Sequence, residues 1–470
     1  MNKILIFLFL IAFSGCVKHP PTPAANVSVN GGKYTISGTV MLTPVDGTAP
    51  VDTVVDPPGP PGIVTADMIG INTHPWHPVK ILDPIKCRRI YLSSYYFWLP
   101  DGIKPQPMQQ AGTPVAWGID DCFRNIKSNG GIILACIHQT PEWYRPTGRQ
   151  DGGGDFAPLK AGLSRSAPAS YKDYAEMLFQ VTAREGRKVW PLDVLKVSPN
   201  ARWNGDLNEK KTGMDLLNYI EPWNEPEKWW LKGSEAYFAP EETAALMSAC
   251  YDGHEGTLGK YAGIKTADAS MKVVMPGLTD YDWPYIQAMD VWFKSNRRDK
   301  RWPCDVANLH HYLSSTNRLG VHPQTWGMGS ATTPAKDPAF SDVSRFVAFF
   351  RAMGLPLWVT ETGGDSGSNS QMSYGSEEAQ GAAMVETVKA YAALGVEKVF
   401  LYTAADEPGS ATGGLWQSSG LLKNQASGYA RKKSMDIVAA YINSLKAQAV
   451  AQPQDINRTK PISIPHQQKR

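Results

Sequence analysis

Three glutamates stand within seven residues of one another in the stretch YIEPWNEPEKWW, residues 219–230. An apolar run leads up to Glu225, and Pro226 blocks further sheet pairing, so we expect a strand that ends at Glu225. A carboxyl group at a strand end can reach a substrate and still be partly desolvated, as a general acid requires. We therefore predict that Glu225 is the acid, that Glu221 is a buried supporting carboxylate, and that Glu227 is a solvated charge on the loop rim.

A second carboxylate with the same setting occurs in the stretch LPLWVTETGG. Glu361 ends an apolar run there, and two glycines open the loop behind it. The two glutamates are 361 − 225 = 136 residues apart, which is three β/α units of about 45 residues in a barrel of ordinary size. The spacing predicts that they lie on the fourth and seventh strands of one barrel.

The elements that must position these glutamates recur along the chain as short apolar runs separated by helical patterns. Helices are expected at SYKDYAEMLFQVTAREG, SEEAQGAAMVETVKAYAALG and YARKKSMDIVAAYINSL. Alternating strands and helices of this kind predict a single (β/α)₈ TIM barrel. The alternative is an open doubly wound sheet, but no glycine-rich phosphate loop follows any predicted strand. The eight predicted strands are residues 67–74, 87–93, 131–138, 216–225, 272–277, 306–312, 357–362 and 398–404.

Several of the predicted strands end in polar residues. The active sites of barrels of this type are built at the carboxyl ends of the strands, so these side chains should converge on one mouth. They are His74, His138, Glu225, His310, Tyr312 and Glu361.

With WNEP at the fourth strand and TE at the end of the seventh, the sequence resembles clan A of the glycoside hydrolases, and it is similar to families 5 and 39. The resemblance covers about residues 64–447. It implies a retaining hydrolase of β-linked oligo- or polysaccharides, in which Glu225 is the acid/base and Glu361 the nucleophile. Retention requires two carboxyl groups about 5–5.5 Å apart.

The same resemblance implies supporting residues around the two glutamates. Asn224 would bind the sugar 2-hydroxyl, and Tyr312 would hydrogen-bond the nucleophile, with His310 on the same strand face. The arginine of the second strand would be Arg88 or Arg89. Strand alternation lets only one of them point inward, and we expect this to be Arg89.

Aromatic residues are candidates for stacking on sugar rings. Clan members often carry a tryptophan at the end of the eighth strand, but this chain reads FLYTAADEP, so Tyr402 or the later Trp416 would have to serve. His138 is a further candidate for substrate binding, from its strand-end position. For each tryptophan alone, core packing is an equal alternative to ligand contact. The tryptophans concerned are Trp143, Trp223, Trp229, Trp230 and Trp416.

Lys3 is followed by the ten-residue apolar run ILIFLFLIAF, which is too short to span a bilayer but typical of an export signal. The run ends at FSGC, which resembles the lipobox of bacterial lipoproteins. We expect a signal peptide over residues 1–15, lipidation of Cys16 and a location at the bacterial cell envelope. The alternative is an ordinary cleaved signal.

The regions outside the predicted barrel are polar. Residues 16–62 are proline-rich and predict a tether that contains a possible short hairpin. Residues 63–448 form the predicted barrel domain, and residues 449–470 form a predicted disordered tail.

Charge and cysteine content argue against several other classes of function. The 47 basic and 44 acidic side chains give no concentrated basic face for nucleic acid. Five cysteines remain after Cys16, at wide spacings without a C-x-x-C motif, so neither a disulfide framework nor a zinc site is indicated. We expect no cofactor and no metal. The competing function from another class is a non-catalytic polysaccharide-binding TIM-barrel lipoprotein.

Overall fold

The computed structural model describes part of the chain and divides it into two compact units, Met1–Val54 and Val55–Arg470. The predicted signal peptide, Cys16 and most of the predicted tether and tail lie outside the described residues. In the first unit, β1 (Asn26–Asn30) and β2 (Lys33–Ser37) pair in antiparallel fashion. The described residues are 26–30, 33–37, 64–105, 108–109, 116–145, 154–198, 208–228, 231, 234–279, 283–312, 339–367, 373–407 and 416–451.

The second unit contains one parallel sheet of eight strands, and one strand lies within each predicted range. The prediction that the fourth strand ends at Glu225 is wrong, because β10 ends at Glu221 and only Asn224 forms a further bridge. The strand order is β11-β10-β9-β4-β3-β14-β13-β12. The first strand along the chain therefore pairs with the last, and every other neighbour is the next strand in sequence. This order fits a sheet that curls as in a (β/α)₈ barrel and excludes the open doubly wound alternative. The strands are β3 (Ile69–Thr73), β4 (Cys87–Ser93), β9 (Ile132–His138), β10 (Tyr219–Glu221), β11 (Lys272–Val273), β12 (Ala307–His310), β13 (Leu357–Gly363) and β14 (Lys398–Tyr402).

Backbone hydrogen bonds also join the two edge strands of this sheet. The amide of Met275 donates to the carbonyl of Val306 at 2.8 Å, and the amide of His310 donates to the carbonyl of Leu278 at 2.6 Å. Val306 directly precedes β12 and His310 ends it, whereas Met275 and Leu278 lie in the segment that follows β11. The two edges are therefore bridged over the length of β12.

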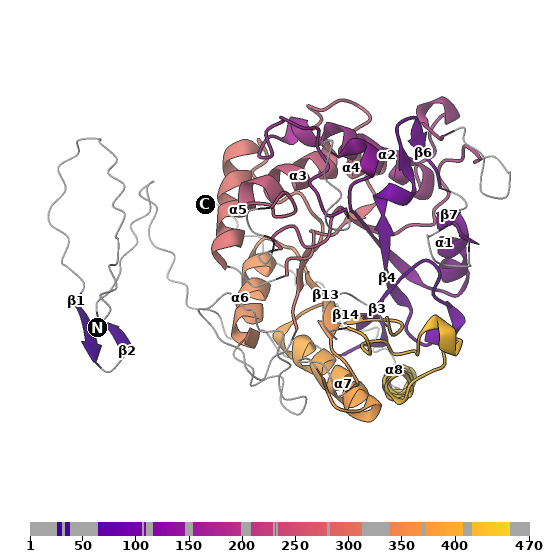
Figure 1. Cartoon of the computed structure of the whole chain (residues 1–470), viewed down its shortest axis with the longest axis vertical. Coiled ribbons are helices and arrows are strands. Elements are labelled where there is room, and N and C mark those ends of the chain that lie inside the picture. Colours follow the sequence, from indigo (N-terminus) through magenta and orange to yellow (C-terminus); the bar gives the residue numbers. More distant parts are fainter. Residues whose placement is uncertain are drawn as a thin grey trace, which may run out of the picture. The chain divides into compact units, whose positions relative to one another are not determined.

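Helices surround the sheet, as Figure 1 shows for α3 to α8. The three predicted helices are confirmed as α2, α7 and α8. Two small antiparallel pairs follow β4, formed by β5 (Trp98–Leu99) with β6 (Gly102–Ile103) and by β7 (Met108–Gln109) with β8 (Ala116–Trp117). The helices are α1 (Ile119–Ser128), α2 (Lys172–Glu185), α3 (Pro240–Asp252), α4 (Ile264–Ala267), α5 (Trp283–Asn296), α6 (Ala339–Ala352), α7 (Glu377–Leu394) and α8 (Lys433–Ala451).

The inside of the curled sheet is filled by side chains and is apolar at one end. Leu134, Trp358 and Phe400 are buried together there with residues of three further strands or strand extensions. Gly70 provides room for this packing, because a Cβ at that position would lie 2.4 Å from the ring of Phe400. Side chains two residues further along the strands point the same way, and these are the polar groups of the site.

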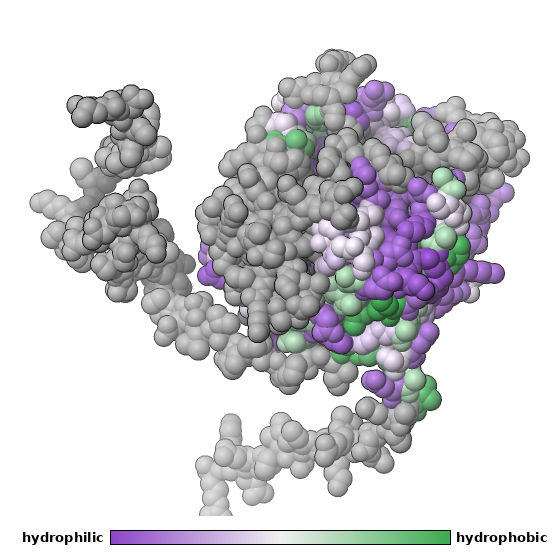
Figure 2. Space-filling view, turned by 60° about the horizontal axis from the view of Figure 1, so that its bottom comes forward, coloured by the Kyte–Doolittle hydropathy of each residue, from purple (hydrophilic) through white to green (hydrophobic). Residues whose placement is uncertain are grey.

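The coloured part of the surface in Figure 2 is mainly polar, and its apolar side chains form small groups. Within the described ranges, no helix is both long and apolar enough to cross a membrane.

Candidate active site

Strand alternation brings the predicted site residues to one end of the sheet. Arg89 and Tyr91 are two residues apart on β4, and both contact Glu361 on β13. His310 and Tyr312 are two residues apart on and just after β12, and both also approach Glu361. The expectation that strand-end side chains converge is thus met for these residues.

Glu361 lies in a dense set of hydrogen-bond donors and is 5% exposed. Its Oε1 accepts from Arg89 Nη1 at 2.8 Å and from the Tyr91 hydroxyl at 2.6 Å, and its Oε2 accepts from the Tyr312 hydroxyl at 2.9 Å. Burial acts to raise the pKa of Glu361, but His310, Arg89 and the two tyrosine hydroxyls outweigh it and lower this pKa. A low pKa keeps the carboxylate ionised, as a nucleophile requires.

A register shift in β13 lets Glu361 point into the site. Thr360 already points inward, since its hydroxyl donates to Asn308 Oδ1 at 2.8 Å, and strict alternation would send Glu361 outward. The pairing of β13 is shifted against both neighbours, between Leu309 and His310 on β12 and between Val359 and Thr362 towards β14. Irregularities of this type re-aim side chains next to active sites.

Glu225 lies beyond β10, where Asn224 still forms a bridge with Gly277. Its backbone φ of 49° is in the left-handed region, and its amide donates to the carbonyl of Gly277 at 3.0 Å. The Glu225 side chain is 16% exposed, its Oε1 lies 2.9 Å from His310 Nδ1, and its Oε2 lies 3.9 Å from Lys228 Nζ. This carboxyl group is partly buried and still open to a ligand.

Arg89 connects the two halves of the site. Its Nε and Nη2 donate to the two oxygens of Glu221 at 2.6 and 2.9 Å, and Nη2 also donates to Asn224 Oδ1 at 2.7 Å. Arg89 Nη1 donates to Asn72 Oδ1 as well as to Glu361. Arg89 therefore points inward, as expected.

Arg88 points the other way. Its Nη2 donates to the carbonyl of Val79. The choice between the two arginines that the sequence left open is decided by these contacts.

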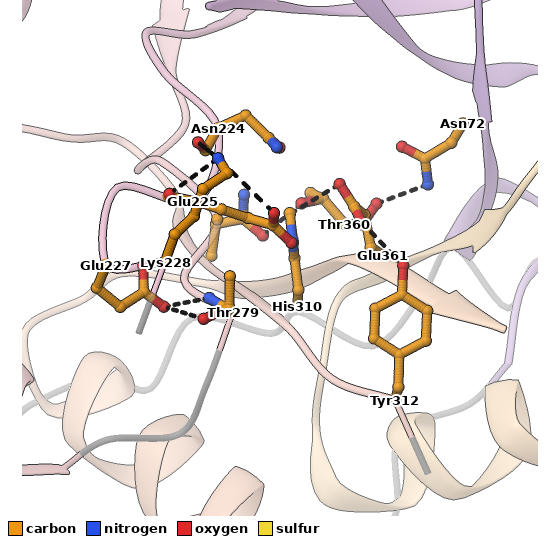
Figure 3. Close-up of polar contacts among 12 residues, drawn as sticks. Asn72, Asn224, Glu225, Glu227, Lys228, Thr279, His310, Tyr312, Thr360 and Glu361 are labelled. Carbon is orange, nitrogen blue, oxygen red and sulfur yellow. Dashed lines mark hydrogen bonds and ion pairs between the residues drawn. The ribbon is translucent and has the colours of Figure 1, made fainter. Parts of the chain in front are cut away.

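Glu221 and Glu227, the other two glutamates of residues 219–230, are both buried but have different hydrogen-bond partners. Glu221 is fully buried, pairs with Arg89 and accepts from the amide of Gly277 at 2.9 Å, as the prediction of a supporting carboxylate requires. The prediction for Glu227 is wrong. This side chain is 3% exposed, and its Oε1 accepts from both the amide and the hydroxyl of Thr279 (Figure 3). The loop folds back onto the segment after β11, a contact that local sequence does not reveal.

The two candidate catalytic carboxylates lie close together. One carboxylate oxygen from each of Glu225 and Glu361, together with one ring nitrogen of His310, lie within 4.8 Å of one another. Three such atoms could in principle hold a metal ion. However, Arg89 contacts Glu361 and Lys228 lies near Glu225, so two cations already occupy the surroundings that a metal ion would need. The two carboxyl groups are thus close enough for both to contact one small ligand group.

Two of the predicted aromatic residues lie beside Glu361. The ring of Trp416 is 4.7 Å from that of Tyr312 and 5.0 Å from that of Tyr402, measured between centroids. Tyr312 itself donates to Glu361, so Tyr402 and Trp416 extend an aromatic wall from the residue that binds this carboxylate.

The other tryptophans do not join this wall. Trp223 is 1% exposed and packs against Tyr174 and Phe238, so of the two alternatives for this tryptophan the structure favours core packing. Trp143 is exposed, but its indole donates to the carbonyl of Trp98, and among the described contacts none links it to the carboxylates. Trp229 and Trp230 lie outside the described residues.

His138 ends β9 and is 9% exposed. Its ring lies 5.8 Å from that of Tyr91, and neither ring nitrogen has a hydrogen-bond partner among the described residues. Burial, with the positive charges of Lys228 and Arg89, lowers the pKa of His138 to about 3. His138 is thus a neutral, unpaired polar side chain at the mouth.

Several residues of the site do not follow from the motifs. Tyr91 could have been found, because it follows Arg89 by two positions on one strand, and Asn308 precedes His310 by the same spacing. Lys228 had no such signal. Its Nζ donates to the carbonyls of Asn224 at 3.0 Å and Glu225 at 3.2 Å (Figure 3), and it lies 3.6 Å from Asp155 Oδ2.

No family model matches the chain, and no curated protein matches it. Solved structures with a similar fold include glycosidases, the class of enzymes that the sequence resembles. A hyperthermophilic β-glucosidase from Pyrococcus furiosus has 11% identity and a TM-score of 0.47, over 82% of this chain and 96% of that one. β-Glycosidase BGL167 has 13% identity and a TM-score of 0.46, over 86% and 100%. A family 51 α-L-arabinofuranosidase from Bifidobacterium longum has 14% identity and a TM-score of 0.44, over 82% and 74%.

Proposed function

We propose that the chain is a retaining glycoside hydrolase of clan A type that cleaves β-linked oligo- or polysaccharides. The observation that carries the proposal is the pair Glu225 and Glu361, whose carboxylates approach within 4.8 Å at the end of the sheet. Their environments differ as the two roles demand. Glu361 is buried among donors that keep it ionised, and Glu225 is more exposed and has fewer donors.

In the first step, Glu225 donates its proton to the glycosidic oxygen while Glu361 attacks the anomeric carbon. The bond from that carbon to the oxygen breaks, the leaving sugar departs as an alcohol, and an ester to Glu361 forms. In the second step, the Glu225 carboxylate takes a proton from water, the water oxygen attacks the anomeric carbon, and the ester breaks. The configuration is therefore retained.

Asn224 is suited to hold the sugar beside the reacting carbon. Arg89 engages its amide oxygen, so the amide NH₂ group is the end that can donate to a sugar hydroxyl. Tyr402 and Trp416 supply an apolar face of the type that stacks on sugar rings.

Assays of purified protein on a panel of β-linked polysaccharides, with NMR of the first-formed anomer, test the proposal. We expect hydrolysis with retention, and Glu361→Gln should abolish it. In Glu225→Ala, added azide should restore turnover of an activated aryl glycoside and yield a glycosyl azide of the substrate's configuration. An inverted product would contradict the nucleophile role of Glu361. If the wild-type protein binds polysaccharide but cleaves no more than Glu361→Gln, the chain is a binding protein.

We also propose that the protein is exported and anchored to the bacterial cell envelope through a lipid on Cys16. The support is the apolar run before FSGC at the chain's start. Labelling cells with radioactive palmitate should mark the wild-type protein and leave Cys16→Ser unlabelled, and equal labelling of both would contradict the proposal.

A further inference from the structure

A second polar cluster lies near Tyr91, whose hydroxyl binds the candidate nucleophile. His74 follows β3, and Glu407 follows β14, 333 residues later in the chain. His74 Nε2 lies 3.0 Å from Glu407 Oε1, and their side chains are 23% and 36% exposed. The pair is thus both ordered and accessible.

Ring contacts place this pair next to the reacting carboxylate. The ring of Tyr91, whose hydroxyl binds Glu361, lies 5.5 Å from His74 and 5.8 Å from His138. Trp76 stacks on His74 with parallel rings 4.5 Å apart and supports it from behind. We call His74, His138 and Glu407 the polar wall.

The polar wall offers hydrogen bonds of both kinds. A Glu407 carboxylate can only accept, whereas the neutral ring of His138 donates at one nitrogen and accepts at the other. Both nitrogens of His138 are buried without a partner among the described residues, and buried polar groups of this kind normally have one. A ligand with several hydroxyl groups would supply donors and acceptors together.

The cations near the wall are already engaged. Arg89 directs all five of its N–H groups to oxygens of Glu221, Asn72, Glu361 and Asn224. Lys228 is 6% exposed and is held by two backbone carbonyls. An anionic substituent at the wall would therefore meet Glu407 and Glu361 without a free cation among the described residues to compensate.

We infer that the polar wall binds the hydroxyl groups of an uncharged sugar next to the nucleophile, and that it disfavours sugars that carry a carboxylate. The inference rests on the proposed function and specifies its substrate class. Glu407 is the specificity-determining residue, since it accepts from hydroxyls and repels a uronate.

The test compares kcat/KM for aryl glycosides that share one leaving group. Neutral substrates are the β-glucoside, β-galactoside, β-mannoside, β-xyloside and α-L-arabinofuranoside, and the anionic ones are the β-glucuronide and β-galacturonide. Release of reducing ends from β-glucan, xylan and mannan against polygalacturonate extends the comparison to chains. We expect the best neutral substrate to exceed either uronide at least 100-fold. Glu407→Gln should lower kcat/KM for that substrate and reduce the neutral-to-uronide ratio at least tenfold.

Glu142→Gln is the matched control, because Glu142 is an exposed carboxylate on the loop after β9 and should leave the ratio unchanged. A uronide cleaved as well as the best neutral substrate, or a ratio that Glu407→Gln leaves unchanged, overturns the inference. If either of these results is obtained but Glu361→Gln still abolishes cleavage of the substrates, only the inference fails and the proposed function survives. If the wild-type protein cleaves none of these substrates faster than Glu361→Gln, the proposed function fails and the inference fails with it.

Discussion

Gly277 lies directly against His310. A Cβ at position 277 would be 2.1 Å from His310 Nε2, a distance at which the imidazole has to move. The backbone of Gly277 also accepts from the amide of Glu225 and donates to Glu221. Gly277 thus fixes the position of the His310 ring between the two candidate catalytic carboxylates.

Gly277→Ala should therefore lower kcat strongly. The added methyl group displaces His310 from Glu225, which it contacts at 2.9 Å, and small misplacements in active sites cost about 100-fold in rate. Steady-state kinetics on any substrate found for the wild type measures the effect. Gly162→Ala is the control, because its Cβ would meet nothing within 4 Å and its φ of 80° affects only local backbone strain. Unchanged kcat in Gly277→Ala would show that the position of His310 is unimportant.

The neighbouring arginines of β4 form a matched pair of variants. Arg89→Lys removes the planar fork that binds Glu221, Asn224 and Glu361, and lysine cannot replace those contacts. We expect a loss of roughly 100-fold or more in kcat/KM and a fall in unfolding free energy, because lysine keeps the charge but loses hydrogen bonds to charged groups that are worth about 1.5–3 kcal/mol each. Arg88→Lys should leave kcat/KM near the wild-type value, because Arg88 points away from the site. Activity and urea denaturation of both variants check this, and equal losses of activity would contradict the assigned orientations.

Tyr91→Phe should change the dependence of activity on pH. The Tyr91 hydroxyl contributes to the lowered pKa of Glu361, and its loss raises that pKa. In the proposed mechanism Glu361 must be ionised to attack, so activity should fall as the pH drops through its pKa. The acidic limb of kcat/KM against pH should therefore move to higher pH in Tyr91→Phe. A hydrogen bond to a charged group is worth about 1.5–3 kcal/mol, so a rate loss of about 10- to 100-fold should accompany the shift.

Tyr96→Phe is the control for Tyr91→Phe, since Tyr96 follows β4 and none of its described contacts reaches the two carboxylates. The acidic limb of kcat/KM against pH in Tyr96→Phe should coincide with that of the wild type. An unmoved limb in Tyr91→Phe would mean that another group controls the pH profile.

Sequence periodicity predicts the strands and most of the site. When one side chain of a strand points into the barrel, the side chains two positions before and after it on that strand point inward as well. Arg89 with Tyr91, and His310 with Tyr312, follow this rule. Glu361 reaches the site only because the pairing of β13 is irregular on both sides, so its place at the strand end and its spacing from Glu225 predicted it, whereas strict alternation would not have. The burial of Glu227 and the pairing of His74 with Glu407 depend on how loops fold back over the strand ends, and no local pattern encodes such contacts.

Lys228 supports the backbone of the candidate acid. Its Nζ binds the carbonyls of Asn224 and Glu225, and Glu225 has a left-handed φ of 49°, a conformation that costs a non-glycine residue of order 1–3 kcal/mol. Lys228→Met should reduce kcat about 10- to 100-fold, in line with the cost of misplacing a catalytic group, and should leave Asp155 without its cation.

The double variant Lys228→Met with Asp155→Asn separates these two effects. Removing the stranded charge should recover part of the lost stability in urea denaturation, whereas kcat should stay low because the carbonyls of Asn224 and Glu225 still lack their donor. Additive losses of stability would show that Lys228 and Asp155 do not interact.

Glu185 at the end of α2 should make stability depend on pH. Burial, and then the charge of Asp120, raise the pKa of Glu185 to about 8, although Arg184 Nε lies 3.1 Å from its Oε1. Its pKa in the unfolded chain is near the ordinary value of 4.5. The folded protein therefore holds a proton that the unfolded chain has released between these values. Stability should fall as the pH rises through this window, by up to about 1.4 kcal/mol per unit.

Glu185→Gln removes this titration, so the decline in unfolding free energy from about pH 5 to pH 8 should flatten and the variant should be the more stable protein near pH 8. Glu176→Gln is the matched control on the same helix, since Glu176 is partly exposed and its lysine partners lie 3.7 and 3.9 Å away. Weak pairs of that kind contribute little, so the control should keep the wild-type slope. Urea denaturation at several pH values measures both, and equal slopes in the wild type and Glu185→Gln would show that Glu185 is ionised in the folded protein.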